Sequence, residues 1–300
     1  MLILAIGEIL WDMLPAGKQL GGAPANFAYH AAQLGADVRL VTAVGDDELG
    51  REIVDRGHGL GLDTSFVAVD PAHSTGVVTV ALEAGQPSYT IHENVAWDFI
   101  PQSPALLHLA GRADCVCFGT LAQRSPTSRA TITAVLAHAR PDAVRICDVN
   151  FRQHYFDAET VAASLAAASV VKLNDHELPR LMALVGASSS APSRLFERYP
   201  SLRLVALTRG AKGSLLVTRD GEVDDHPGLP ASPLADTIGA GDAFTAALAV
   251  GLLRRLPLDR INADANAIAA YLCTQTGATP PLPQNLVERI AGPAALRARR

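Results

Sequence analysis

The residues best suited to chemistry stand in the segment 236–244, which reads Asp-Thr-Ile-Gly-Ala-Gly-Asp-Ala-Phe. The next residues, 245–253, are mostly Ala, Leu, Val and Gly without proline, which predicts a buried helix. Gly239, Ala240 and Gly241 would then stand at the N-terminus of that helix. Unpaired N–H groups and the helix dipole favour an anion such as phosphate there, and small residues let it approach the backbone.

Asp242 places a carboxylate beside the same anion site. A carboxylate would repel a phosphate that merely bound there. Its presence makes sense if a neutral hydroxyl group must lose a proton as it attacks phosphorus. On this segment alone, an equally good interpretation is a glycine loop that leads into a helix whose first-turn Asp favours the dipole.

A second segment, 21–28, reads Gly-Gly-Ala-Pro-Ala-Asn-Phe-Ala and opens a predicted helix that runs to about Leu34. Pro24 suits the first turn of a helix. Asn26 carries both donors and an acceptor in an otherwise apolar helix start, as needed to bind a sugar hydroxyl group. The alternative is a helix cap of unusual sequence.

Together the two segments resemble the signatures of the PfkB (ribokinase-like) carbohydrate kinases. Segment 21–26, with Gly35 and Gly45 after it, resembles the N-terminal signature, and 236–244 resembles the C-terminal one. They occur in the right order, about 210 residues apart in a chain of 300. The resemblance covers essentially the whole chain and implies transfer of the ATP γ-phosphoryl group to a sugar.

The resemblance assigns roles at the reaction centre. Asp242 would be the general base, and the backbone amides of Gly239, Ala240 and Gly241 would bind the transferring phosphoryl group. The sugar would be bound by residues of three segments, Asp12, Gly22, Asn26, Asn150 and Arg152, the last two from an Asp-x-Asn-x-Arg element. Glu8 would brace its loop, and Trp97 and Asp98 would either close the pocket or only pack.

Other segments of the chain resemble the motifs with which this family binds the nucleotide and metal ions. Asn174 and Glu177 resemble an Asn-x-x-Glu motif that organises Mg²⁺ through water, although the same spacing suits a capping box. The resemblance places the nucleotide near Asn174, Thr208, Gly210, Gly213, Gly241 and Asn266. Asp236 matches the position of a K⁺ ligand in many relatives, with carbonyl groups near Gly277, and Pro281 stands where some relatives carry a hydroxyl residue.

Short apolar runs alternate with helical stretches and must position these residues. The predicted strands are 2–6, 38–44, 115–118, 144–147, 170–173 and 202–207, and the predicted helices include 47–56, 127–139 and 159–168. This alternation predicts an α/β fold whose mainly parallel sheet is covered on both faces. The β-prone segments 9–14, 18–20, 75–82 and 88–92 predict a small antiparallel sheet over it. The resemblance implies the same three-layer α/β/α, Rossmann-like core with a β lid, as one domain over 1–300 with a lid from about 9–20 and 72–98.

Composition excludes several classes of protein. The chain is 49% hydrophobic and 18% charged, with a net charge of −5, so no basic surface for nucleic acid is expected. Its four cysteines form no Cys-x-x-Cys pair, which argues against a zinc or disulfide framework. No apolar run is long enough to span a membrane and no targeting segment is evident, so a cytoplasmic protein is expected.

The substrate is predicted from the same segments. The Gly-Glu-Ile-Leu-Trp-Asp opening, segment 21–26 and the Asp-Val-Asn-Phe-Arg element resemble bacterial fructokinases most, which predicts fructose as the sugar and ATP with Mg²⁺ as its partners. Ribose, 2-keto-3-deoxygluconate or a nucleoside remain alternatives, because a few lid residues decide among them. A non-catalytic sugar or nucleotide sensor and a nicotinamide-dependent oxidoreductase are further alternatives, and the exposed lid edges favour a homodimer.

Overall fold

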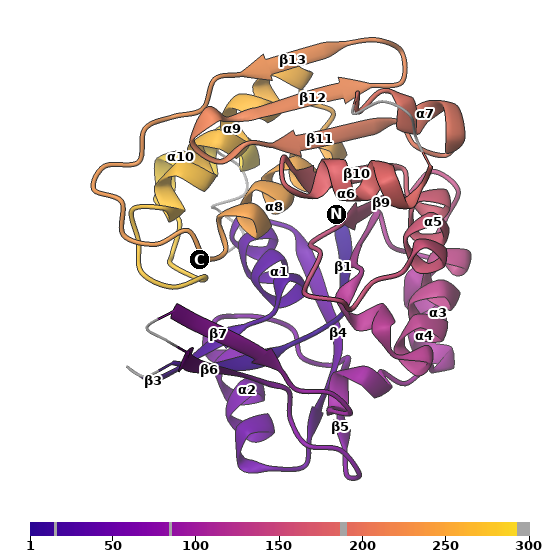
Figure 1. The fold of residues 1–300 in the computed structure, drawn as a ribbon, viewed down its shortest axis with the longest axis vertical. Coiled ribbons are helices and arrows are strands. Elements are labelled where there is room, and N and C mark those ends of the chain that lie inside the picture. The colour runs from indigo at the N-terminus through magenta and orange to yellow at the C-terminus, as the bar shows by residue number, and fades with distance from the viewer. Residues whose placement is uncertain (15–16, 84–85, 187–190, 293–300) are drawn as a thin grey trace.

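A nine-stranded sheet forms the centre of the computed structural model, which describes residues 1–14, 17–83, 86–186 and 191–292 (Figure 1). Its strand order is β13-β12-β11-β10-β9-β8-β1-β4-β5. The strands are β1 (Leu2–Ile6), β4 (Asp37–Gly45), β5 (Val67–Asp70), β8 (Cys115–Gly119), β9 (Val144–Asp148), β10 (Val170–Asn174), β11 (Leu204–Thr208), β12 (Ser214–Thr218) and β13 (Val223–His226). Neighbours from β5 to β11 pair in parallel, and β12 and β13 add antiparallel strands at one edge.

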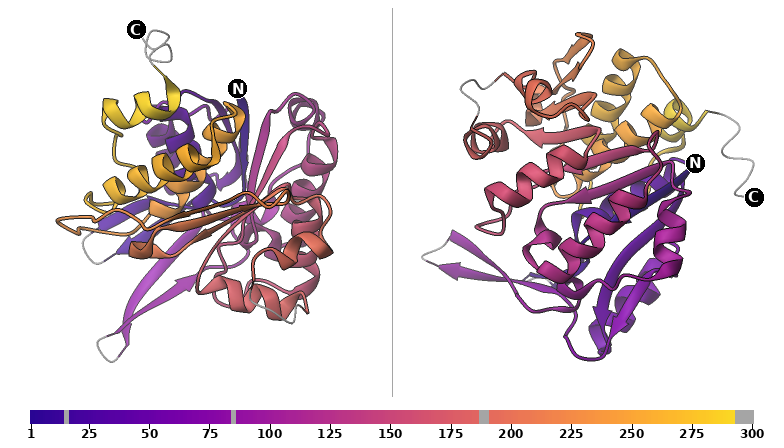
Figure 2. Two further views of the ribbon diagram at one scale, coloured as in Figure 1. Left: turned by 90° about the horizontal axis from the view of Figure 1, so that it is seen from above. Right: turned by 90° about the vertical axis from the view of Figure 1, so that its right-hand side faces the viewer.

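Helices cover both faces of this sheet, as the alternation of segments predicts (Figure 2). On one face lie α1 (Ala23–Gln33), α8 (Ala240–Leu253), α9 (Leu258–Leu272) and α10 (Gln284–Ala291). The other helices are α2 (Glu48–Gly59), α3 (Pro104–Ala110), α4 (Pro126–His138), α5 (Ala158–Ala167), α6 (Glu177–Leu184) and α7 (Arg194–Arg198), with 3₁₀ turns at Ala96–Phe99, Leu121–Arg124 and Gly210–Lys212. The expected three-layer, Rossmann-like α/β fold is confirmed.

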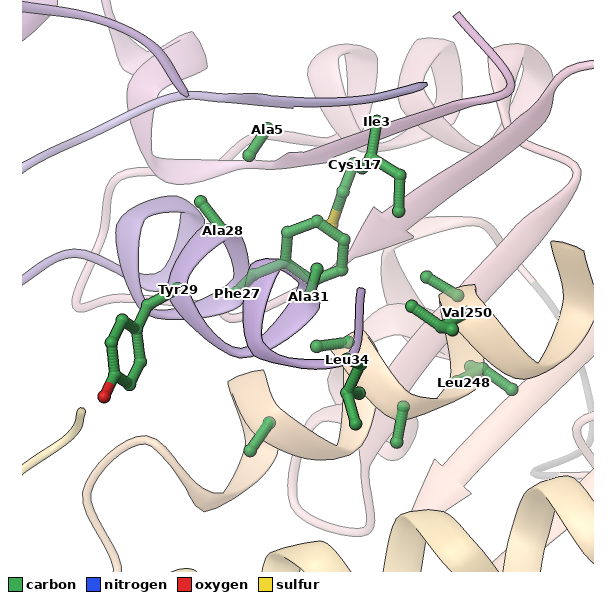
Figure 3. Packing of buried hydrophobic residues seen from close by; sticks show 14 of the residues in the cluster. Ile3, Ala5, Phe27, Ala28, Tyr29, Ala31, Leu34, Cys117, Leu248 and Val250 are labelled. Atoms are coloured by element: carbon green, nitrogen blue, oxygen red, sulfur yellow. The ribbon is translucent and has the colours of Figure 1, made fainter. Parts of the chain in front are cut away.

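The central strands β1 and β8 are apolar along their whole length because helices bury both of their faces. In β1, Ile3, Leu4, Ala5 and Ile6 are completely inaccessible to solvent. Figure 3 shows the core on the α1 face, where Phe27 of α1 and Leu34, just after this helix, pack toward β1, β8 and α8. This packing fixes α1 against α8, and the N-termini of both helices carry predicted site residues.

A second sheet of four strands, the lid, projects from one end of the molecule (Figures 1 and 2). It contains β2 (Leu10–Leu14), β3 (Gly17–Gly21), β6 (Val77–Glu83) and β7 (Gln86–Ile91), in the order β3-β2-β6-β7. The pairs β2–β3 and β6–β7 are antiparallel as expected.

The central pair of the lid corrects one detail of the prediction. Strands β2 and β6 run parallel, so the lid is a mixed sheet rather than an antiparallel one. The reason is that β2 follows β1 and β6 follows β5, and these two strands of the large sheet run in the same direction. Both chain segments therefore leave the large sheet at the same edge.

Among the described residues, no helix combines the length and apolar character needed to cross a membrane.

Candidate active site

The carboxyl ends of β1, β9 and β10 meet at one edge of the large sheet, facing the N-termini of α1 and α8. Glu8 follows β1, Asp148 ends β9, and Lys172 lies within β10. Ligands of open α/β sheets gather at this edge because loops and helix N-termini converge there. Residues far apart in the sequence therefore form one polar site.

Asp242 and Asn26 form the contact at the centre of this site. The side-chain Nδ2 of Asn26 donates a hydrogen bond of 2.8 Å to Oδ2 of Asp242. Asn26 is buried, whereas Asp242 is only half-buried, in the first turn of α8. Asn26 was expected to bind the sugar directly. In the structure its amide nitrogen orients the predicted base, which leaves the second N–H of that nitrogen and the carbonyl oxygen for another partner.

The surroundings of Asp242 hold its pKa above the usual range for aspartate. Burial raises the pKa of Asp242 to about 6, and the negative charge of Asp148 acts in the same direction. The hydrogen bond from Asn26 and the positive charges of Lys172 and Arg152 oppose this rise. A carboxylate that is ionised at neutral pH yet more basic than usual is suited to accept a proton.

The turn before α8 has the geometry of an anion site. Gly239 has φ 75°, and a Cβ there would lie 2.7 Å from the carbonyl oxygen of Ala278. The first intrahelical bond runs from Ala243 N–H to Gly239 O (2.9 Å), so the N–H groups of Gly241 and Asp242 precede the helix ladder. The N–H of Ala240 faces Thr237 O at 3.4 Å. The amide of Gly241 is therefore better placed for an anion than that of Ala240.

Lys172 adds a positive charge to this turn, and sequence reasoning missed it. A Cβ placed on Gly241 would lie 3.1 Å from Lys172 Nζ. The ammonium group also lies 3.1 Å from both carboxylate oxygens of Asp148, and Thr245 donates a 2.9 Å hydrogen bond to the same carboxylate. Burial alone would lower the pKa of Lys172, but Asp148, Glu177 and Asp242 outweigh it, so the pKa is raised and the lysine stays charged.

The sugar-side residues cluster around the start of the lid. Asp12 is half-buried in β2, and a Cβ at Gly21 would collide with its Oδ2. Gly22, with φ 108°, lies against the backbone of Glu8, so neither glycine position has room for a side chain. Burial raises the pKa of Asp12, and the positive charge of Arg152 opposes the rise.

Arg152 and Asn150 come from the loop after β9. Arg152 is exposed, and its charge lowers the pKa values of Glu8, Asp12 and Asp242. Its positive charge therefore acts on all three carboxyl groups of the pocket. Asn150 has φ 40°, a left-handed conformation that is uncommon for residues other than glycine and is often found at functional sites.

Asn174 and Glu177 form a reciprocal capping box. Oδ1 of Asn174 accepts a hydrogen bond from Glu177 N–H (2.9 Å), and Oε2 of Glu177 accepts one from Asn174 N–H (2.8 Å). Oε1 of Glu177 accepts another from Phe151 N–H (2.9 Å). Among the described residues, no group of three or more His, Cys, Asp or Glu side chains could hold a metal ion directly. These oxygens still have free lone pairs, so they fit a hydrated Mg²⁺ bound through water.

The predicted nucleotide residues lie around β10, β11 and β12. Thr208 ends β11 and donates from Oγ1 to Leu173 O (3.3 Å), and a Cβ at Gly210 would meet open space. Gly213 instead lies against the backbone of 226–228. Asn266 is buried, and its Nδ2 donates to Ser214 Oγ (2.7 Å). In the structure, Gly213 therefore packs against the backbone of 226–228, and Asn266 is engaged in a hydrogen bond within the protein.

Asp236 joins two loops beside the anion turn. Oδ1 accepts a 2.8 Å hydrogen bond from Ile238 N–H, and Oδ2 accepts a 3.3 Å bond from Gly277 N–H. This places the predicted K⁺ ligand and the predicted carbonyl segment in contact. A carboxylate with free lone pairs between two loops is a suitable ligand for a hard cation.

A cavity of about 520 Å³, lined by residues of the segments 93–99, 123–127 and 154–160, does not include Asp242. Its walls contain an ion pair in which Arg124 Nε lies 2.8 Å from Asp98 Oδ1. The Arg124 guanidinium also lies 4.0 Å above the ring of Trp97 and donates to His92 O (2.6 Å). Trp97 and Asp98 therefore support the base of the lid from below, which matches the packing alternative expected for them.

Comparison with known proteins places the chain in a family of kinases. The family described as pfkB family carbohydrate kinase matches residues 16–285. A fructokinase of Klebsiella pneumoniae is 31% identical over 303 residues, covering 94% of this chain and 96% of its own length. An aminoimidazole riboside kinase of Salmonella typhimurium is 28% identical over 300 residues, covering 94% of this chain and 92% of its own length. Relatives named for different acceptors are thus about equally similar.

Solved structures agree in fold over nearly the whole chain. A sugar kinase of Pyrococcus horikoshii in complex with ATP has a TM-score of 0.79 at 29% identity, covering 93% of this chain and 94% of that one. A double mutant of Vibrio cholerae fructokinase with fructose, ADP and potassium ion bound has a TM-score of 0.77 at 25% identity, covering 97% and 98%. The chain belongs to the PfkB family and is an ATP-dependent carbohydrate kinase.

Proposed function

We propose that this protein transfers the γ-phosphoryl group of ATP to the primary 6-hydroxyl group of fructose, with Asp242 as the general base. The observation that carries the proposal is the position of Asp242. It stands at the N-terminus of α8, fixed by Asn26 at 2.8 Å and next to the ammonium group of Lys172. A base, an anion site and a positive charge thus meet at one point, as transfer of a phosphoryl group requires.

In the proposed reaction Asp242 accepts the proton of the sugar hydroxyl group. The hydroxyl oxygen forms a bond to the γ-phosphorus, the bond between that phosphorus and the β–γ bridging oxygen breaks, and ADP leaves with the electron pair. The amides of the turn before α8, Gly241 above all, and Lys172 stabilise the charge on the phosphoryl oxygens. A hydrated Mg²⁺ near Asn174 and Glu177 would neutralise charge on the nucleotide phosphates.

The pocket favours a neutral sugar over a phosphorylated one. Of the basic groups in the lid, Lys18 forms an ion pair with Glu52 and lies over the ring of Trp11. His92 is exposed and lies within hydrogen-bonding distance of Thr79 Oγ1 (3.2 Å). The charge of Arg152 is already partly offset by the carboxyl groups of the pocket, on which it acts. A second phosphate would therefore meet acidic side chains instead of a basic cluster.

We favour fructose because the chain is similar to fructokinases along its whole length and because Asp12 and Asn26 offer acceptors for sugar hydroxyl groups. The alternatives are ribose, 2-keto-3-deoxygluconate and a nucleoside, and the similarity to a riboside kinase keeps the last of these open. We also propose that K⁺ binds at Asp236, next to Gly277, where it would support the turn before α8.

The proposal is tested by measuring ADP release from ATP and Mg²⁺ with a panel of sugars, with and without K⁺. The panel contains fructose, glucose, ribose, 2-keto-3-deoxygluconate, fructose 6-phosphate and adenosine. We expect turnover with fructose well above that with the other members, and faster turnover with K⁺. A kcat/KM that is highest for another acceptor would overturn the assignment to fructose while leaving the kinase chemistry in place.

A further inference from the structure

Glu8 is an ionisable side chain of the pocket that has no role in the proposed reaction. It follows β1 and is only 3% exposed. Within the part of the chain that the structure describes, its Oε2 has no hydrogen-bond partner. Buried polar atoms are almost always paired, so an unpaired carboxyl oxygen next to a reaction centre requires an explanation.

A second unpaired atom complements the first. Asn26 is 4% exposed, and its Oδ1 has no hydrogen-bond partner among the described residues. Its Nδ2 is engaged with Asp242 at 2.8 Å. Because a side-chain amide has one donor end and one acceptor end, this bond leaves the acceptor end in need of a donor.

Glu8 lies against the first turn of α1, which also carries Asn26. The backbone N–H of Ala23, the first residue of α1, hydrogen-bonds to the carboxyl group of Glu8. Asn26 follows three residues later, on the same face of the helix. Gly22 allows the close approach, since a Cβ there would lie 2.5 Å from the carbonyl oxygen of Glu8.

The electrostatic surroundings favour a proton on Glu8. Burial raises the pKa of Glu8 to about 7, and the negative charge of Asp242 acts in the same direction. The N–H groups of Glu8 and Ala23 and the charge of Arg152 oppose the rise. Glu8 and Asp148, the last residue of β9, border one small cavity of about 10 Å³. This cavity has room for no more than one water molecule.

We propose that Glu8 is a positioning residue that keeps a proton in the working enzyme and, as a neutral acid, donates a hydrogen bond to Asn26 Oδ1. That bond holds the amide with Nδ2 on Asp242, the orientation that the base needs. When Glu8 ionises, its carboxylate attracts Nδ2, the amide turns over, and Asp242 then faces an acceptor instead of a donor. The proposal rests on the proposed function, in which Asp242 is the general base.

The proposal predicts a bell-shaped dependence of turnover on pH, because Asp242 must be ionised and Glu8 protonated. The acid limb lies near pH 6 and the alkaline limb above pH 7. A bound sugar covers the pocket, which adds to burial and moves the alkaline limb upward. Since the two carboxyl groups interact, both limbs belong to the pair rather than to one residue.

Two substitutions separate positioning from packing. Glu8→Ala removes the donor, and we expect turnover at pH 7 to fall by about tenfold, the effect of one lost hydrogen bond, with little change in KM for the sugar. Glu8→Gln supplies a donor that does not titrate, so it should recover most of this loss and abolish the alkaline limb. An alkaline limb that persists in Glu8→Gln, or turnover in Glu8→Ala within twofold of the wild type, would overturn the proposal.

A measurement without turnover tests the protonation itself, and it still decides should Glu8→Ala fail to fold. Infrared spectra of the wild-type protein should show a protonated carboxyl band at pH 6.5 that fades above pH 8 and is clearly weaker in Glu8→Gln, where only the partly protonated Asp242 contributes. Glu48→Gln, at an exposed position of α2, is the control that should keep the band. A band unchanged in Glu8→Gln contradicts the proposal. A lack of sugar turnover in the wild type would instead refute the proposed function.

Discussion

Lys172 and Asp148 form a buried ion pair beside the proposed anion site, with side chains 8% and 9% exposed. A buried pair of this kind seldom stabilises a fold more than apolar residues would, because removing both charges from water is costly. The lysine nevertheless lies next to Gly241, where charge develops during phosphoryl transfer. We interpret the pair as a device that holds a positive charge at the reaction centre.

At the residue scale, Lys172→Met should lower kcat by about 10²-fold, the usual effect of losing one stabilising group at a developing charge. It should also destabilise the fold by about 3 kcal/mol, because Asp148 becomes a buried charge without its partner. The double variant Lys172→Met/Asp148→Asn should recover stability but not turnover. Recovery of both in thermal unfolding and ADP-release assays would show that the lysine serves the fold alone.

Some site residues could be recognised from a local sequence pattern, whereas Lys172 belongs to the site only because distant elements pack together. Asp242 and Asn26 stand in short glycine-containing segments whose local pattern already indicates a helix N-terminus. Lys172 stands within the apolar run 170–173, and its proximity to Gly241 depends on the packing of β10 near α8, which no local pattern encodes. The one available signal was a charged residue inside a predicted buried strand, since lysine is rarely buried without a task.

At the scale of elements, the start of α8 depends on Gly239. The residue has a left-handed conformation and lies directly against Ala278, so a side chain would be both strained and in collision. This contact positions the amides of the turn with respect to Asp242. The contact between Gly239 and Ala278 therefore fixes the first turn of α8, and with it the proposed anion site.

Gly239→Ala should lower kcat by more than tenfold, because the turn must shift away from Ala278 and its amides lose their alignment. Gly61→Ala is the matched control, since Gly61 has φ 73° but open space around its Cα. Both variants carry backbone strain of about 1 kcal/mol, visible as a lower melting temperature. Equal turnover in the two variants would show that strain alone, without displacement of the turn, accounts for the effect.

Most of the large sheet could be predicted because its strands are continuous apolar runs separated by amphipathic helices. The short edge strands β5 and β13 were not predicted, because each has only four residues and is largely exposed or half-exposed. The parallel pairing of β2 with β6 was also missed, since it follows from the direction in which the chain leaves the large sheet. Pairing between distant strands is a property of the topology, which local patterns do not specify.

At the scale of the whole molecule, the lid is attached to the body through strand β7. Gln153 Nε2 donates to Tyr89 O (2.5 Å), and Tyr155 OH donates to Ile91 O (3.1 Å), both from the loop after β9. The same loop carries Arg152, which faces the pocket. We therefore predict that closure of the lid over a sugar and the position of the pocket loop are coupled.

Tyr155→Phe should loosen this attachment and raise KM for the sugar by about fivefold, the effect of one net hydrogen bond. ADP release in the absence of sugar should increase, because water reaches the phosphoryl group more easily. Tyr199→Phe is the control, since the hydroxyl group of this buried tyrosine has no hydrogen-bond partner among the described residues. An unchanged KM in Tyr155→Phe would contradict the coupling.

We also expect the lid to provide the surface of a homodimer. Strands β3 and β7 are the edges of its sheet, so within the described part of the chain each has a neighbouring strand on one side only. We predict that two copies associate through these edges. Sedimentation at micromolar concentration should give twice the mass of the 31.5 kDa chain. A monomer mass under these conditions would contradict this prediction.

The central claim is that Asp242 removes the proton from the sugar hydroxyl group. It is tested most directly by comparing ADP release from ATP, Mg²⁺ and fructose in the wild type and in Asp242→Asn at pH 7.5. Asparagine keeps the shape of the side chain and can still bond to Asn26, so the variant should fold normally and bind ATP. We predict that its kcat falls by about 10²-fold or more, the scale of a lost general base. A kcat within a few-fold of the wild type would contradict the account.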